Sequence, residues 1–286
     1  VGETRTNIWG VGAHKVHNEP GGYHTIPSLP SVDALNGFEW PDPDDERICG
    51  SIYRQAADFP GGDLWISGGH GCLIWEVANP MIGMERLLEY FYTEPAFVKE
   101  VFERIVDFHM GIARHYIRAG VKSVGFSDDL AMQSGPFFGP AILEEFFKPG
   151  YKRIFDFYKQ HGVIVGQHCD GNIVSLLDFF MDVGLDILNP VQVTANDVLE
   201  VRRLTQGRMC LHGGISNVIV TNGPPDAIEA HVRDSMSALG REGGYFPAVD
   251  HHMPTPDAHR RAVTAAIEKW GRYPLAPRQA PQAAEQ

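Results

Sequence analysis

The chain carries a histidine and a carboxylate two residues apart, just after an apolar run. The run is Val163 to Val165, and His168 and Asp170 follow it within a few residues. Short apolar runs of this kind are typical of buried parallel strands. Because side chains alternate along a strand, His168 and Asp170 are expected to face one way and Cys169 the other, into the packed interior. Such a pair can hold a metal or contact a substrate, or its carboxylate can simply orient the imidazole.

Two adjacent carboxylates follow a second apolar run. The strand predicted at Ser123 to Ser127 leads directly to Asp128 and Asp129. Carboxylates are costly to bury, and burial raises their pKa toward the range that suits acid–base catalysis. One of the two is therefore expected to be catalytic, and alternation along the strand does not say which. The alternative is a cap at the start of a helix.

The composition excludes some classes of partner. The 286 residues carry a formal net charge of −12 and lack the clustered Lys and Arg that bind nucleic acids or anionic membranes. No apolar run approaches the roughly 20 residues of a membrane-spanning helix. The four cysteines are scattered along the chain, which favours a cytosolic protein with reduced thiols. The first residue is Val1 rather than Met, as in a fragment or a trimmed product.

The rest of the pattern alternates between strands and helices. Strands are predicted at 64–67, 123–127, 163–168, 187–189, 209–212 and 245–249, and helices at 82–91, 94–119, 140–160, 173–183, 196–204, 224–239 and 256–270. A break is expected near Pro149, because proline removes a hydrogen bond from a helix. The short connections indicate right-handed parallel crossovers.

This alternation predicts an α/β fold, a TIM (β/α)8-type barrel over residues 64–272 with its first βα unit absent or modified. An open doubly wound sheet would carry a glycine-rich nucleotide motif, and none is present. Polar residues instead end nearly every strand, as they do where a barrel gathers strand ends at one mouth. Residues 1–63 are predicted to be an irregular excursion over that mouth, and 273–286 a flexible tail.

Several of the strand-end residues are candidates for substrate binding. Gly213 either lets the main chain approach a ligand closely or turns a tight corner of the barrel. His251 is a candidate catalytic acid, and it can also be a plain loop residue before Pro254. The full set of predicted substrate-binding residues is His70, Asn172, Asn189, Gln192, His212 and Gly213.

Five segments, in order, carry a family resemblance. They are the run GFSDDLAMQSGPFFGPAILEEFFKPGYKRIFDFYKQHG, then GQHCDGNI, LNPVQ, LHGGIS and GGYFPAVDHHMPTPD. Over roughly residues 63–272 the chain resembles the uroporphyrinogen decarboxylase superfamily, which includes the corrinoid-dependent methyltransferases. It is more similar to that branch than to the true decarboxylases. The resemblance implies a TIM barrel with its site at the carboxyl ends of the strands.

The resemblance also implies a metal and a partner protein. Methyltransferases of this branch bind zinc through a His-x-Cys pair and a further cysteine near the last strand. Here His168 matches the histidine, Asp170 stands at the first cysteine and His251 at the second. The implied metal ligands are therefore His168, Asp170 and His251, with zinc as the expected ion and methylcobalamin carried by a partner corrinoid protein. Because neither position holds a thiolate, activation of a thiol acceptor does not follow from the resemblance.

Three functions remain open from the sequence. The first is a methyltransferase-like enzyme that demethylates a small methoxylated or methylated substrate, with Asp128 or Asp129 and His251 in acid–base roles. The second is a lyase that releases CO2 from a polycarboxylated substrate, although the arginine-rich segment of the true decarboxylases is not found. The third is a non-catalytic barrel that binds a ligand, with a partner subunit or a homodimer covering exposed strand edges.

Overall fold

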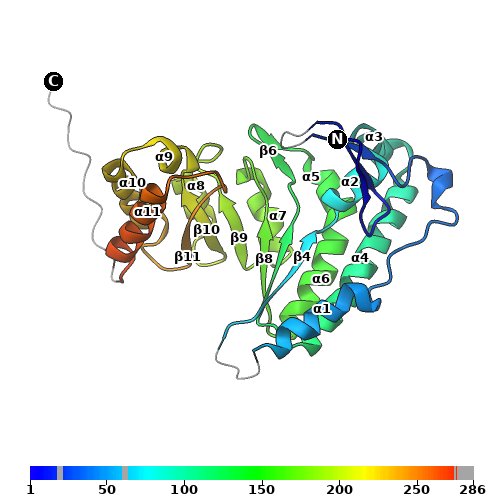
Figure 1. Cartoon of the computed structure of the whole chain (residues 1–286), viewed down its shortest axis with the longest axis horizontal. Helices are drawn as coiled ribbons and strands as arrows, with labels where there is room; N and C mark the ends of the chain where they lie inside the picture. The colour runs from blue at the N-terminus through cyan, green and yellow to red at the C-terminus, as the bar shows by residue number, and fades with distance from the viewer. Residues whose placement is uncertain (18–21, 60–63, 274, 276–286) are drawn as a thin grey trace. The chain divides into compact units, whose positions relative to one another are not determined.

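The computed structural model describes residues 1–17, 22–59, 64–273 and 275 (Figure 1). Within them the main sheet consists of β4 (Ser67–Cys72), β5 (Ser123–Ser127), β8 (Ile164–His168), β9 (Ile187–Val191), β10 (Cys210–Ile215) and β11 (Tyr245–Val249). Its six strands are hydrogen-bonded in the order β11-β10-β9-β8-β5-β4. Parallel strands alternating with helices are the repeating unit of a TIM barrel, so the predicted fold class is confirmed.

The chain forms two compact units. The first comprises residues 1–129 and 138–166, and the second comprises residues 130–137 and the chain from Gln167 onward. In the first unit β4 pairs in parallel with β5, and in the second β10 pairs in parallel with both β9 and β11. The residues of β8 are divided between the two units.

The helices of the first unit pack around a core of aromatic rings. Phe91, Phe138 and Phe147 are buried and contact one another with ring centroids 4.9 to 6.0 Å apart. These rings give the unit a large apolar interior against which its helices are held. The helical elements are η1 (Val32–Leu35), α1 (Glu46–Ala57), α2 (Trp75–Ile82), α3 (Met84–Thr93), α4 (Pro95–Arg118), α5 (Pro140–Ile142), η2 (Leu143–Phe147) and α6 (Lys148–Gln160).

In the second unit α10 packs on β10 and β11, and α11 packs on α10. The helices here are η3 (Val174–Leu176), α7 (Leu177–Asp182), α8 (Val198–Thr205), α9 (Asn217–Asn222), α10 (Pro225–Leu239) and α11 (Asp257–Trp270). A two-stranded hairpin of β6 (Ala131–Met132) and β7 (Gly135–Pro136) belongs to this unit. In the described part of the chain, no helix combines the length and the apolar character needed to cross a bilayer.

The strand predicted at 64–67 is wrong. Leu64 and Trp65 are 59% and 64% exposed, and the strand is instead the glycine-rich β4. A Cβ on Gly68 would lie 2.8 Å from the ring of Tyr116, so only glycine lets this strand pack so closely on α4. Pairing with β5 and contact with the helix therefore outweigh the stronger β-propensity of the preceding residues.

The N-terminal segment is more regular than predicted. β1 (Thr4–Thr6), β2 (Gly12–Lys15) and β3 (Tyr23–Ile26) form an antiparallel sheet. Between β1 and β2 the chain turns at Asn7, whose side chain accepts hydrogen bonds from the N–H groups of Trp9 and Val11.

Two further predictions concern helix regularity and the tail. The helix predicted at 140–160 is irregular rather than broken at Pro149: the π-helical turn η2 runs directly into α6, and Pro149 lies in the first turn of α6. The tail predicted to be flexible at 273–286 lies outside the described residues, apart from Tyr273 and Leu275.

Candidate functional site

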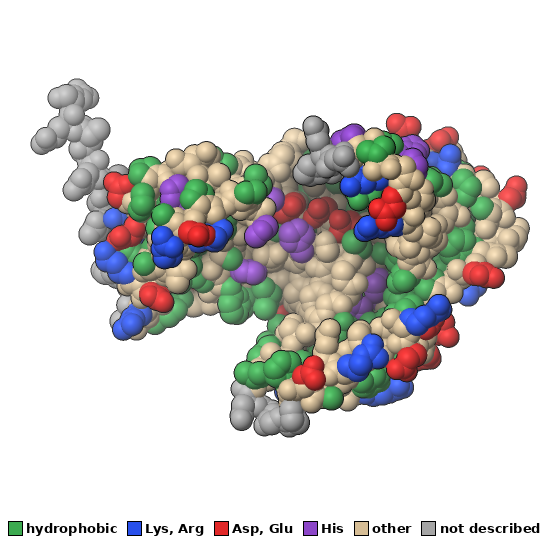
Figure 2. All heavy atoms as spheres, in the orientation of Figure 1, with side chains coloured by type: hydrophobic (Ala, Val, Ile, Leu, Met, Phe, Trp, Pro, Cys, Tyr) green, Lys and Arg blue, Asp and Glu red, His purple; other side chains and the backbone are tan. Residues whose placement is uncertain are grey.

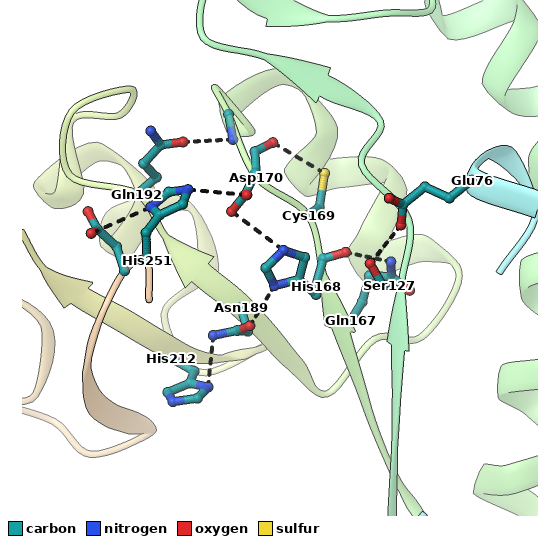
Figure 3. Close-up of polar contacts among 12 residues, drawn as sticks. Glu76, Ser127, Gln167, His168, Cys169, Asp170, Asn189, Gln192, His212 and His251 are labelled. Atoms are coloured by element: carbon teal, nitrogen blue, oxygen red, sulfur yellow. Dashed lines mark hydrogen bonds and ion pairs between the residues drawn. The ribbon is translucent and has the colours of Figure 1, made fainter. Parts of the chain in front are cut away.

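The second unit brings together the three residues predicted as metal ligands. Histidine side chains gather on its visible face, over the strands (Figure 2). One carboxylate oxygen of Asp170 is 3.5 Å from Nε2 of His168, and the other is 3.1 Å from Nε2 of His251 (Figure 3). His168 ends β8 and His251 follows β11, while Cys169 is fully buried, as strand alternation predicts. Asp170 thus joins residues that are far apart in the sequence.

The carboxyl group of Asp170 is charged at neutral pH. Burial by itself would raise its pKa. The hydrogen bond and charge of His168 and the charge of His251 outweigh burial and lower the pKa below its usual value. This carboxylate is therefore a ready acceptor for a proton or a metal ion.

Asn189, in β9, fixes the ring of His168. Its Oδ1 lies 2.9 Å from Nδ1 of His168, and its Nδ2 lies 2.9 Å from Nδ1 of His212. An amide oxygen only accepts and an amide nitrogen only donates, so Nδ1 carries the hydrogen in His168 and accepts one in His212. Burial and the nearby charge of His168 lower the pKa of His212, which suits this neutral acceptor form.

This hydrogen-bond pattern leaves Nε2 of His168 facing a negatively charged oxygen. A nitrogen lone pair and a carboxylate repel each other unless a proton or a metal ion lies between them. His168 and Asp170 offer ligand atoms within 4.8 Å of one another. Imidazole and carboxylate groups are competent ligands for Zn²⁺, and a metal-bound histidine usually donates its second ring N–H to an oxygen acceptor, as His168 does to Asn189. The pair of His168 and Asp170 is therefore compatible with a divalent cation, and His251 contacts the carboxylate of that pair.

Asp250, a strand-end residue that was given no role from the sequence, supports this group. Its side chain is fully buried and accepts hydrogen bonds from the N–H groups of Val193 and Asn217, at 3.2 and 2.9 Å. One of its oxygens is also 3.6 Å from Nδ1 of His251. Its position directly before His251, at the end of β11, was the available sequence signal.

Gln192 and Asn172, also predicted to bind substrate, make close contacts within the second unit. Gln192 is 6% exposed and hydrogen-bonds to Gln133, Thr194 and the N–H of Gly171. Asn172 donates its backbone N–H to the carbonyl of Met132.

Gly213 has a φ of +112°, and a Cβ there would lie 2.8 Å from the backbone nitrogen of Val191. The close approach that this glycine permits is to the neighbouring strand β9.

In the first unit Asp128 has the geometry of a helix cap. Its fully buried carboxyl group accepts hydrogen bonds of 2.7 to 3.0 Å from the N–H groups of Ile74, Trp75 and Glu76, at the start of α2. The hydroxyl of Tyr151 donates a further bond of 2.8 Å. Burial raises the pKa of Asp128 to about 7, against the lowering effect of these hydrogen bonds. The neighbouring Asp129 is half-buried.

His70, also in the first unit, lies among aromatic rings. Its ring stacks on Phe126 with centroids 4.5 Å apart, and its Nε2 is 2.5 Å from the Tyr158 hydroxyl. Its Nδ1 is 3.0 Å from Nδ1 of His109. Burial holds the pKa of His70 well below its ordinary value and lowers that of His109 to about 4.

The buried His109 predicts a loss of stability in acid. Its folded-state pKa of about 4 lies below the ordinary value of 6.5, so its stabilising effect is complete above pH 6.5 and is lost as the pH falls toward 4. The expected loss is about 3 kcal/mol of unfolding free energy. Urea unfolding of wild type and His109→Gln at pH 7.5 and 4.5 would measure it. An equal loss in both proteins would contradict this assignment.

Comparison with known proteins identifies similar chains. The family model for uroporphyrinogen decarboxylase (URO-D) matches residues 22–270. A solved methyltransferase from Methanosarcina mazei has a TM-score of 0.68 and 16% identity, with 93% of this chain and 77% of that chain covered. A B12-independent methionine synthase from Shewanella sp. W3-18-1 has a TM-score of 0.56 and 10% identity, with coverage of 92% and 73%. Curated protein sequences gave no significant match. At these identities the two structures establish similarity of fold.

Proposed function

The chain belongs to the uroporphyrinogen decarboxylase family, and we propose that within this family it is a methyl-transferring enzyme. In this proposal the enzyme uses a divalent ion held by His168, Asp170 and His251. The observation that carries the proposal is the position of Asp170, with one oxygen toward each imidazole. The fold similarity to a methyltransferase supports this choice of reaction class. Zinc is the ion we propose, because His and Asp side chains are among its usual ligands.

The proposed substrate is a small molecule with a methyl group on oxygen or nitrogen. A bound divalent ion would polarise that heteroatom, and cobalt in a corrinoid carried by a partner protein would accept the methyl group. The chain's own residues hold the site in place: Asn189 orients His168, and Asp250 lies beside His251. The heteroatom takes up a proton as it leaves, which solvent water can supply.

The test is a methyl-transfer assay with zinc-loaded protein. Cob(I)alamin would be mixed with a panel of small methyl ethers and methylamines, and formation of methylcobalamin would be followed by absorbance. Transfer that requires zinc supports the proposal. The metal-free protein and His252→Ala serve as controls, since His252 is an exposed neighbour of His251. Metal-independent release of CO2 from uroporphyrinogen, without methyl transfer, would favour the lyase instead.

A further inference from the structure

The short loop that carries Asp170 is fastened to the β6–β7 hairpin. The Sγ atom of Cys169 accepts a hydrogen bond of 3.3 Å from the N–H of Leu130, just before the hairpin. On the other side of Asp170, the N–H of Asn172 donates to the carbonyl of Met132 at 2.8 Å. The hairpin therefore holds the backbone on both sides of the proposed metal ligand.

Gly171 makes the contact between loop and hairpin unusually close. Its φ is +90°, and a Cβ at this position would lie only 2.5 Å from the carbonyl oxygen of Met132. A side chain here would push the hairpin away, and the backbone conformation itself favours glycine.

A pair of glutamine side chains completes the attachment. Gln133, at the hairpin tip, and Gln192, after β9, exchange two hydrogen bonds of 3.0 Å, each amide donating to the oxygen of the other. The Gln192 oxygen also accepts from the N–H of Gly171 at 2.9 Å, and its nitrogen donates to Thr194. An amide has two donor and two acceptor positions, so all four positions of Gln192 are used within the protein.

We propose that Gln133 and Gln192 are positioning residues that set the place of Asp170 and thereby the affinity of the metal site. The inference rests on the proposed function, because it concerns the ion held by that site. It also gives Gln192 a role other than the substrate binding expected from the sequence. Gln133 is suited to the task because it reaches the loop from a separate segment while its own side chain stays near the surface.

Gln133→Met tests the proposal, because methionine keeps the length of the side chain and removes both hydrogen bonds. We expect the dissociation constant for Zn²⁺ to increase up to about 10-fold, the lower end of the effect of losing a group that contacts a metal ligand directly, because Gln133 acts on Asp170 through Gln192 and Gly171. Competition with a chromophoric chelator would measure it. The visible spectrum of the Co²⁺-substituted protein should also change, since it reports the ligand geometry around the ion. The melting temperature should stay nearly the same. Ser134→Ala, at the exposed hairpin tip, is the matched control and should leave all three measurements unchanged.

A second variant keeps the test decisive if the first does not fold. Gly171→Ala displaces the hairpin from the opposite side and should weaken Zn²⁺ binding in the same direction. Wild-type affinity and an unchanged Co²⁺ spectrum in either folded variant would overturn the inference and leave the proposed function standing. A wild-type protein that binds neither ion would overturn the metal site and this inference with it. Asp170→Asn supplies the reference for the loss of a direct ligand.

Discussion

Asp170→Asn is expected to lower Zn²⁺ affinity at least about 100-fold, and to abolish zinc-dependent methyl transfer, while the protein stays folded. Asparagine keeps the shape of the side chain and one oxygen acceptor, and it removes the negative charge between the two imidazoles. In the wild type that charge is retained because His168 and His251 hold the pKa of Asp170 below its usual value. The variant leaves two histidines without their shared anionic partner.

The measurements are zinc stoichiometry by elemental analysis and the dissociation constant by chelator competition. His252→Ala should bind zinc like the wild type, because the control side chain is exposed and adjacent to His251. If Asp170→Asn instead retains stoichiometric zinc at wild-type affinity, Asp170 is not a ligand. His168, Asp170 and His251 would then interact as ion-paired side chains without a metal.

Asp128→Ala is expected to reduce the free energy of unfolding by about 4 kcal/mol. The substitution leaves three backbone N–H groups at the start of α2, and the hydroxyl of Tyr151, without their common acceptor in a buried place. Asp128→Asn should reduce the free energy of unfolding less, since its amide oxygen can still accept hydrogen bonds. Urea denaturation monitored by circular dichroism would measure both changes.

Asp156→Ala provides the control for this prediction. Asp156 lies on the exposed surface of α6, where it pairs with Lys152, and its loss should change stability by no more than about 0.5 kcal/mol. A folded Asp128→Ala protein of wild-type stability that has lost only its activity would contradict the capping role. That outcome would favour the acid–base role considered from the sequence.

Local patterns were enough to predict most of the elements. β5 and β11 have the predicted bounds: burial alternates along β5, and β11 is a short apolar run of the kind that forms a parallel strand. The helix predicted at 94–119 is α4, and Gly120 follows it with a φ of +77°, as a helix end of this kind requires. Prediction failed at β4, where glycines lie in a strand only because Tyr116 and β5 pack against it.

Part of the candidate site could also be predicted from the local sequence pattern. The common direction of His168, at the end of β8, and Asp170, just beyond it, follows from the two-residue period of an extended chain. Asp128 and Asp129 could not be told apart, because their difference lies in partners distant in sequence: Asp128 meets the N–H groups of α2 and the hydroxyl of Tyr151.

The order of residues alone established an α/β chain with polar groups at its strand ends and identified His168 and Asp170 as a pair, since these features depend on near neighbours. Only the tertiary structure showed the hydrogen bonds that join His212, Asn189 and His168. It also showed the hydrogen bonds between Gln133 and Gln192 beside the Asp170 loop. Hydrogen bonds require donors and acceptors within about 3 Å in suitable directions, and for residues 20 to 60 positions apart only the tertiary structure determines that geometry.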